Sequence, residues 1–151
     1  MFREAPRRTL SRHDVGNVTD RPRELGPRDP GEPRDRREPP SAGQISDQIA
    51  REILQIHEES YGKGAGKAHA LVGDGFVVVV LDELELLPNE QFLVEKGEGD
   101  TVIQVRSRYQ QAIESTFSAA IERATGRRVV GFASSTNIDE PRFVAEIFKL
   151  E

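Results

Sequence analysis

Residues 100–126 read DTVIQVRSRYQQAIESTFSAAIERATG, and apolar side chains recur along this stretch at intervals of three and four residues. That spacing gathers them on one stripe of an α-helix. The residues of the stripe are Val102, Val105, Tyr109, Ile113, Phe117, Ala120, Ile121 and Ala124. The charged residues mostly fall outside it: Arg106, Arg108, Glu114, Glu122 and Arg123. The pattern therefore predicts one long amphipathic helix on which the rest of the domain packs.

Both ends of this helix carry signals in the sequence. Asp100 can cap the first turn with its carboxylate, and Gly126 supplies the left-handed residue that ends the last turn. A helix of about 25 residues spans roughly 37 Å. The short β-rich runs on either side of it need an apolar surface, and we expect this helix to provide that surface.

The charge of the chain is divided unevenly between its two parts. Residues 1–40 hold ten arginines and eight acidic residues, whereas residues 41–151 hold 11 basic and 18 acidic residues, a net charge of −7. An acidic folded part argues against nucleic-acid binding, which requires a basic face. The chain has no cysteine, which excludes a disulfide framework, a thiolate zinc site and a cysteine nucleophile.

No stretch of the sequence has the length or the apolar character of a membrane span. The longest apolar run, residues 76–81, has six residues, against about 20 needed to cross a bilayer. The N-terminus has no apolar core of the kind found in signal peptides. We therefore expect a cytoplasmic protein without direct membrane insertion.

Residues 1–40 contain seven of the nine prolines, interleaved with charged residues. So few of these residues can be buried that the entropy lost on ordering is not offset, and we expect a disordered Arg/Pro-rich tail. A mixed-charge tether and a solvated leader without a specific role both fit this composition. Residues 41–151 then form the folded domain.

A second amphipathic helix is predicted from Gln44 to Tyr61, with Ser41 as its N-cap and Gln44 at the capping-box position. His57 lies on or beside its apolar stripe. The other histidine of the domain is His69, and two histidines without thiolates make a weak metal site. A structural or surface role for His57 is the better interpretation, and no metal is expected.

The segment Tyr61-Gly-Lys-Gly-Ala-Gly-Lys-Ala68 follows this helix. It is not a nucleotide-binding P-loop, because Gly62 and Gly66 enclose three residues instead of four and Ala68 replaces the hydroxyl that binds magnesium. Two interpretations remain: a glycine connector with positive φ angles, or an anion site formed by backbone N–H groups with lysine side chains. The residues of that anion-site hypothesis in this loop are Lys63, Gly64, Gly66 and Lys67.

The remaining strands come in two pairs. Lys67–Val72 and Phe76–Leu81 predict a β-hairpin on a tight Gly-Asp-Gly turn. The second of these strands shows no alternation, which favours a central position covered at least in part on both faces. Val129–Ser134 and Phe143–Leu150 predict a third and a fourth strand.

The polar link Ser134–Pro141 joins the last two strands. Two interpretations of its polar side chains remain. They form hydrogen bonds with their own backbone, or they form a ligand pocket with the glycine loop at the same end of the sheet. The side chains concerned are Ser135, Thr136, Asn137 and Asp139. Asp82, Glu83 and Asp139 are the acids that an enzyme would use. No nucleophile–base pair accompanies them in the sequence, so we favour a non-enzymatic protein without catalytic residues or cofactors.

The order of these segments resembles one bacterial family. YGKGAGKA after an amphipathic helix, a valine-rich strand, Arg106-Ser-Arg-Tyr-Gln110 in the long helix, and the ending TGRRVVGFASSTNIDEPRFVAEIFKLE are similar to the MpsC-like domain. That family is named for the third component of a Na⁺-translocating membrane-potential-generating system. The likeness covers roughly residues 43–151. Members typically read Gly-Pro-Thr where this chain has Gly64-Ala65-Gly66, and often carry a histidine near Asn137.

The resemblance implies an accessory or regulatory protein of a membrane ion or inorganic-carbon transport system. It implies protein–protein interaction with membrane transporter subunits, in which the pumping chemistry resides. It brings no catalytic residues. A small-anion or ligand sensor that uses the Gly62–Lys67 loop is the alternative function.

Together these segments predict an α+β two-layer sandwich. We expect a four-stranded, mostly antiparallel sheet with the two main helices on one face. The order of the strands is left open. The edges of such a sheet would also allow a homodimer.

Overall fold

The computed structural model describes residues 38–62 and 64–151. The tail expected at residues 1–40 therefore falls almost entirely outside the described residues, as does Lys63. The elements are α1 (Ala42–Tyr61), β1 (Lys67–Gly73), β2 (Phe76–Asp82), α2 (Pro88–Glu95), α3 (Gly99–Thr125), β3 (Val129–Asn137) and β4 (Phe143–Leu150).

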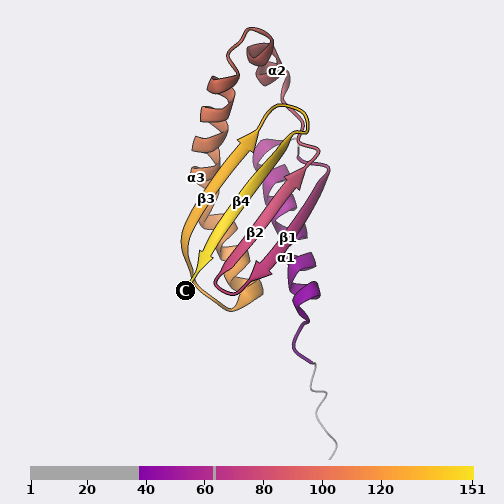
Figure 1. Ribbon diagram of the computed structural model, residues 1–151, viewed down its shortest axis with the longest axis vertical. Coiled ribbons are helices and arrows are strands. Elements are labelled where there is room, and N and C mark those ends of the chain that lie inside the picture. The colour runs from indigo at the N-terminus through magenta and orange to yellow at the C-terminus, as the bar shows by residue number, and fades with distance from the viewer. Residues whose placement is uncertain (1–37, 63) are drawn as a thin grey trace, which may run out of the picture. The chain divides into compact units, whose positions relative to one another are not determined.

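The strands form one antiparallel sheet in the order β1-β2-β4-β3. Helices α1 and α3 lie side by side against one face of it, and among the described elements none covers the other face (Figure 1). The predicted two-layer α+β fold is confirmed. The sequence had left the strand order open, and the structure places the last strand, β4, between β2 and β3.

Helix α3 is continuous from Gly99 to Thr125 and packs on the sheet, as its apolar spacing predicts. Gly126 ends it with a left-handed φ of 67°. The N-cap prediction was wrong. Glu98 occupies the cap position without a capping side chain, two residues before the predicted cap, and Asp100 lies within the first turn, where its charge still favours the helix dipole.

Helix α1 begins as the sequence predicts. The Ser41 hydroxyl accepts a hydrogen bond from the Gln44 N–H, and the Gln44 side chain accepts one from the Ser41 N–H, at 3.3 and 2.8 Å. This capping box satisfies two backbone donors that the helix itself leaves unpaired. At the other end Gly62 adopts a φ of 70° and turns the chain toward β1.

The core lies between the helices and the inner face of the sheet. Strands β2 and β4 supply its centre, since they occupy the middle of the sheet and their alternate residues are fully buried. The main residues of this core are Ile49, Ile53, Val77, Val79, Leu81, Phe117, Ile121, Val144 and Phe148. The central position predicted for β2 is confirmed, but its outer residues Val78 and Val80 are half-buried by neighbouring strands rather than by a further layer.

The apolar stripe of α3 differs from the prediction on one flank. Arg106, expected outside the stripe, is fully buried, whereas Val105 and Tyr109 are 54% and 42% exposed. The reason is tertiary. A short helix, α2, packs beside α3 and brings a carboxylate to Arg106, so the buried face of α3 is rotated at this level.

Strand β3 is longer than predicted. It runs to Asn137, so Ser135, Thr136 and Asn137 are paired with residues of β4 instead of lying in a loop. The polar link shortens to residues 138–142. The extension follows from β4, whose eight residues offer backbone partners along their whole length.

Candidate functional site

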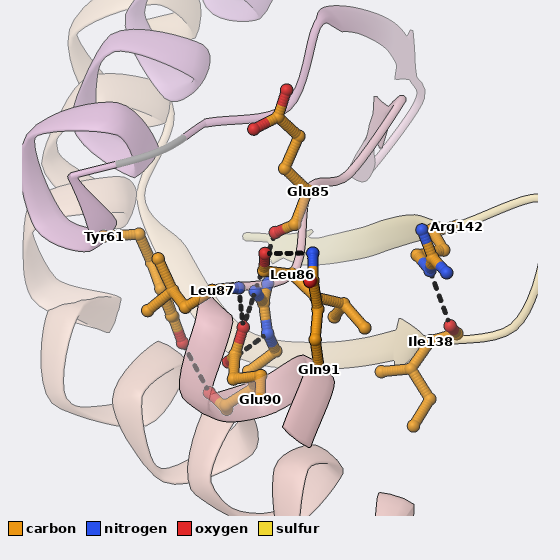
Figure 2. Close-up of polar contacts among 9 residues, drawn as sticks. Tyr61, Glu85, Leu86, Leu87, Glu90, Gln91, Ile138 and Arg142 are labelled. Atoms are coloured by element: carbon orange, nitrogen blue, oxygen red, sulfur yellow. Dashed lines mark hydrogen bonds and ion pairs between the residues drawn. The ribbon is translucent and has the colours of Figure 1, made fainter. Parts of the chain in front are cut away.

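Arg106 of α3 and Glu90 of α2 form a buried ion pair, with 1% and 6% of the two residues exposed. Arg106 donates from Nε and Nη2 to the two carboxylate oxygens of Glu90, at 2.8 and 2.6 Å. Glu90 also accepts a bond from the Leu87 N–H at 2.7 Å, and Arg106 donates to the Glu85 carbonyl at 3.1 Å (Figure 2). This bidentate ion pair neutralises both charges and holds α2 against α3.

Aromatic rings extend this ion pair toward α1. The Arg106 guanidinium lies 4.9 Å from the centre of the Tyr61 ring, and the His57 ring stacks on that ring at 4.9 Å with an angle of 18°. The Tyr61 hydroxyl donates to the Arg106 carbonyl at 3.3 Å. These contacts hold the C-terminal end of α1 against α3.

Burial determines the charge states of His57 and Tyr61. Burial and, to a smaller extent, the nearby Arg106 cation lower the pKa of His57 to about 4, while Glu90 opposes the change. Burial likewise raises the pKa of the Tyr61 hydroxyl. Both groups are therefore neutral at pH 7. Within the described residues neither ring nitrogen of His57 has a hydrogen-bond partner.

Three more polar side chains lie inside the domain: Gln110 of α3, Ser134 of β3 and Glu146 of β4. Gln110 and Glu146 are fully buried, and burial raises the pKa of the Glu146 carboxyl to about 8. In the part of the chain that the structure describes, the polar side-chain atoms of all three lack a hydrogen-bond partner. Buried polar atoms without partners are rare in folded proteins, so this cluster needs an explanation.

A cavity of about 240 Å³ lies beside the ion pair, where α1, α2 and α3 meet. Its walls include Tyr61, Leu93, Val105 and Tyr109, and are mostly apolar. The one carboxylate in its wall, Glu90, is already held by Arg106. The cavity therefore offers apolar contact and little free hydrogen-bonding capacity.

The outer face of the sheet is a second candidate site. In the register of the sheet, the outward-pointing residues of the four strands form four rows that run across the strands. The two middle rows are Leu71–Val78–Ile147–Ala133 and His69–Val80–Ala145–Ser135. Leu71, Ile147 and the adjacent Phe76 are 62%, 46% and 40% exposed. We call these two rows with Phe76 the outer apolar face.

The glycine loop is surrounded by acids. Gly64 and Gly66 line a cavity of about 310 Å³ together with Glu58, Glu83 and Glu85. A Cβ added at Gly64 would lie 2.3 Å from the Glu58 side chain, and one at Gly66 would lie 2.2 Å from that of Glu83. Carboxylate side chains thus rest directly on the loop backbone, and a larger residue at either glycine would have to displace one of them.

Lys67 lies next to this loop, where its ammonium pairs with Glu83 on the surface. The other residues of the predicted anion site, on β3, lie apart from the loop. Lys67 and Asn137 share one cross-strand row, but Asp82 and Phe143 stand between them, a distance of about 14 Å across the sheet. Asn137 donates to the carbonyls of Asp139 and Pro141, at 2.9 and 2.7 Å. Ser135 and Thr136 point to opposite faces of β3.

The candidate acids do not converge either. The Asp82 carboxylate lies 3.6 Å from the His69 ring, Glu83 is paired with Lys67, and Asp139 is exposed in the turn after β3. Across residues 38–62 and 64–151, no three or more His, Asp or Glu side chains are grouped to hold a metal ion.

Sequence reasoning missed the buried polar cluster, although part of its signal was present. In Phe143–Leu150 the residues Val144, Phe148 and Leu150 alternate on one face, and Glu146 occupies the same face. Gln110 precedes Phe117 by seven residues, which places both on the same side of a helix. For both Glu146 and Gln110, the available indication was a single polar residue within a series of apolar residues on the same face.

A family model described as Na⁺-translocating membrane potential-generating system (MpsC) matches residues 41–151. Neither a curated protein nor a solved structure shows significant similarity to this chain. In the described part of the chain, no helix combines the length and the apolar character needed to span a bilayer.

Proposed function

The chain belongs to the MpsC family, whose description refers to a Na⁺-translocating membrane potential-generating system, and on that premise we propose that it is a non-enzymatic accessory protein of a membrane ion or inorganic-carbon transport system. In this proposal it works in the cytoplasm and binds a membrane-embedded subunit of that system. The contact is made by the outer apolar face. The pumping chemistry belongs to the partner.

The observation that carries the proposal is the exposure of apolar side chains on that face. Leu71, Phe76 and Ile147 project from three neighbouring strands, and Val78 and Val80 fill the space between them. Large side chains gathered on one uncovered sheet face typically mark an interaction site, whereas scattered ones do not. Lys149 and Asp82 lie at opposite ends of the face, so charge would also orient the partner.

The size of the face indicates what kind of complex to expect. Four strands at about 4.8 Å and the four rows of the whole outer face at about 6.8 Å cover roughly 500 Å² per partner. A contact of about 1,000 Å² in total is at the weak end of specific interfaces, where transient regulatory complexes are found. This area is more consistent with a regulatory subunit that binds transiently than with a permanent structural subunit.

Replacing Ile147 by arginine is expected to weaken the complex by about tenfold or more, because a charge would be buried at the centre of the contact. The full-length tagged chain would be purified from detergent-solubilised membranes of its own organism. The amount of the transport system's membrane subunits retained with it is the measurement. Val105→Arg is the matched control, since Val105 is equally exposed but lies on α3.

Two results would contradict this proposal. One is equal retention of the membrane subunits by Ile147→Arg and wild type, with both proteins folded. The other is a wild-type chain that sediments as a dimer, becomes monomeric on Ile147→Arg, and retains no membrane subunit at any stage. The second result would assign the outer apolar face to a second copy of the chain.

A small-anion sensor on residues 62–67 is the alternative function. The cavity beside the loop and the Lys67 ammonium support it. Glu58, Glu83 and Glu85 oppose it, because carboxylates in the same wall repel an anion. If the loop binds anions, phosphate or bicarbonate should raise the unfolding temperature of the wild type and not of Lys67→Ala.

A further inference from the structure

The outer face of the sheet carries large side chains over one half and small ones over the other. Leu71 of β1 and Phe76 of β2 are 62% and 40% exposed, and the remaining outward residues of β2 in the two middle rows are valines. On β3 the outward residues of the same rows are Ala133 and Ser135. The half of the face over β1 and β2 is therefore raised, and the half over β3 is recessed.

A second copy of the chain can cover this face in two ways that keep the strands of the two sheets roughly aligned, as packed sheets usually are. Both ways are two-fold symmetric, like most protein dimers. If the two-fold axis runs along the strands, β1 of one copy faces β3 of the other, and β2 faces β4. If the axis runs across the strands, each strand faces its own counterpart.

The first arrangement matches the side chains by size. It places Leu71 over Ala133 of the second copy, so that the raised half of one face enters the recessed half of the other. The second arrangement places Leu71 against His69 of the second copy and Ala133 against Ser135, so one side is crowded and the other is hollow. Interface cores are packed as densely as protein interiors, which favours the first arrangement. Its facing pairs are Leu71 with Ala133, His69 with Ser135, Val78 with Ile147, and Val80 with Ala145.

The Phe76 ring fits the first arrangement as well. It lies against Gly73 of β1, where an added Cβ would be 2.4 Å from the ring. That position of β1 faces Gly131 of the second copy, because Gly73 and Gly131 belong to the same cross-strand row. Gly131 has no side chain, so the second copy leaves space for the ring.

The charges at the two ends of the face do not oppose this arrangement. Lys149 and Asp82 each approach their own counterpart when the axis runs along the strands. With sheets about 10 Å apart and neighbouring strands about 4.8 Å apart, the two Lys149 Cα atoms are separated by about 11 Å. Exposed charges at that separation are largely screened at physiological ionic strength. Association is therefore decided by the fit of the apolar side chains.

We propose that the free chain is a homodimer in which two outer apolar faces pack against each other, with β1 of each copy over β3 of the other. The buried area of roughly 1,000 Å² is at the weak end of specific interfaces, so we expect a dissociation constant of about 1–100 μM. The membrane subunit of the proposed function would contact the same side chains and must displace the second copy. The dimer itself rests on the geometry of the face and not on the identity of that subunit.

Sedimentation of the full chain over concentrations from about 1 μM to about 1 mM tests the dimer. Ala133→Leu should weaken it about tenfold or more, because two leucines then face each other, and Leu71→Ala should weaken it about fivefold by leaving a gap. The double variant should recover most of the wild-type affinity, since the large and small positions are exchanged. Both residues are exposed in the single chain, so the fold of each variant is retained.

Phe92→Ala is the matched control. Phe92 is 57% exposed but lies on α2, away from the sheet, so its removal should leave the dissociation constant unchanged. Three outcomes would overturn the dimer proposed here. The wild type could remain a monomer at every concentration, a dimer could be unaffected by either single variant, or the double variant could be no stronger than Ala133→Leu.

These outcomes are independent of the membrane partner. A wild type that stays monomeric and retains the membrane subunits from detergent extracts would remove the dimer and leave the proposed function standing. A dimer that retains no membrane subunit would do the reverse.

Discussion

Replacing Glu90 by alanine is expected to destabilise the domain by about 3–5 kcal/mol, because the Arg106 guanidinium would stay buried without its partner. The pair lies within the α2–α3 contact, with both side chains almost fully shielded from solvent. Urea unfolding followed by circular dichroism measures the loss as a lower midpoint. For a domain of this size we expect the melting temperature to fall by more than about 10 °C.

Two further variants separate burial from charge. Arg128→Ala removes an exposed partner of Glu151, whose pair is 2.7 Å long, and should cost less than about 1 kcal/mol. The double variant Glu90→Leu, Arg106→Met should recover most of the loss, since it leaves no unpaired charge. A Glu90→Ala cost no larger than that of Arg128→Ala would show that the buried pair contributes little.

Removing the titratable group at residue 146 is expected to change how stability depends on pH. The folded-state pKa of Glu146 lies at about 8, above its usual value of 4.5. Its contribution to stability is therefore fully present below pH 4.5 and is lost as the pH rises through about 8. Relative to wild type, Glu146→Gln should gain roughly 1.4 kcal/mol per pH unit across that window, on the order of 5 kcal/mol in all.

The measurement is the free energy of unfolding of both proteins at matched ionic strength. Other titratable groups of the domain are present in both proteins and cancel in the difference. They include His57, whose lowered pKa of about 4 makes stability fall as the pH drops below its usual 6.5. They also include Tyr61, whose pKa burial raises. A difference that stays constant with pH would place the Glu146 carboxyl in contact with water.

Much of this fold follows from local patterns. The apolar spacing of residues 100–126 predicts α3, Ser41 with Gln44 predicts the start of α1, and the Gly-Asp-Gly turn predicts the hairpin of β1 and β2. Each of these signals depends on residues close in the sequence. The strand order does not, because insertion of β4 between β2 and β3 is decided by packing in the whole sheet.

The candidate sites were less accessible to sequence reasoning for the same reason. Arg106 is buried because Glu90, 16 residues earlier, reaches it from α2, and no periodic pattern contains that contact. Ser134 and Glu146 become neighbours through the register of β3 with β4. The glycine loop drew attention by its composition, yet its acidic surroundings come from Glu58, Glu83 and Glu85 in different segments.

Strand β4 separates two environments by the thickness of one backbone. Glu146 points inward, while its sequence neighbours Ala145 and Ile147 point outward. A proton gained or lost by the Glu146 carboxyl would therefore act on the same peptide groups that carry the outer side chains. No hinge and no domain motion is needed for such coupling. Among the described elements one face of the sheet is uncovered, so a change of protonation on the inner side would reach exposed side chains through a single strand.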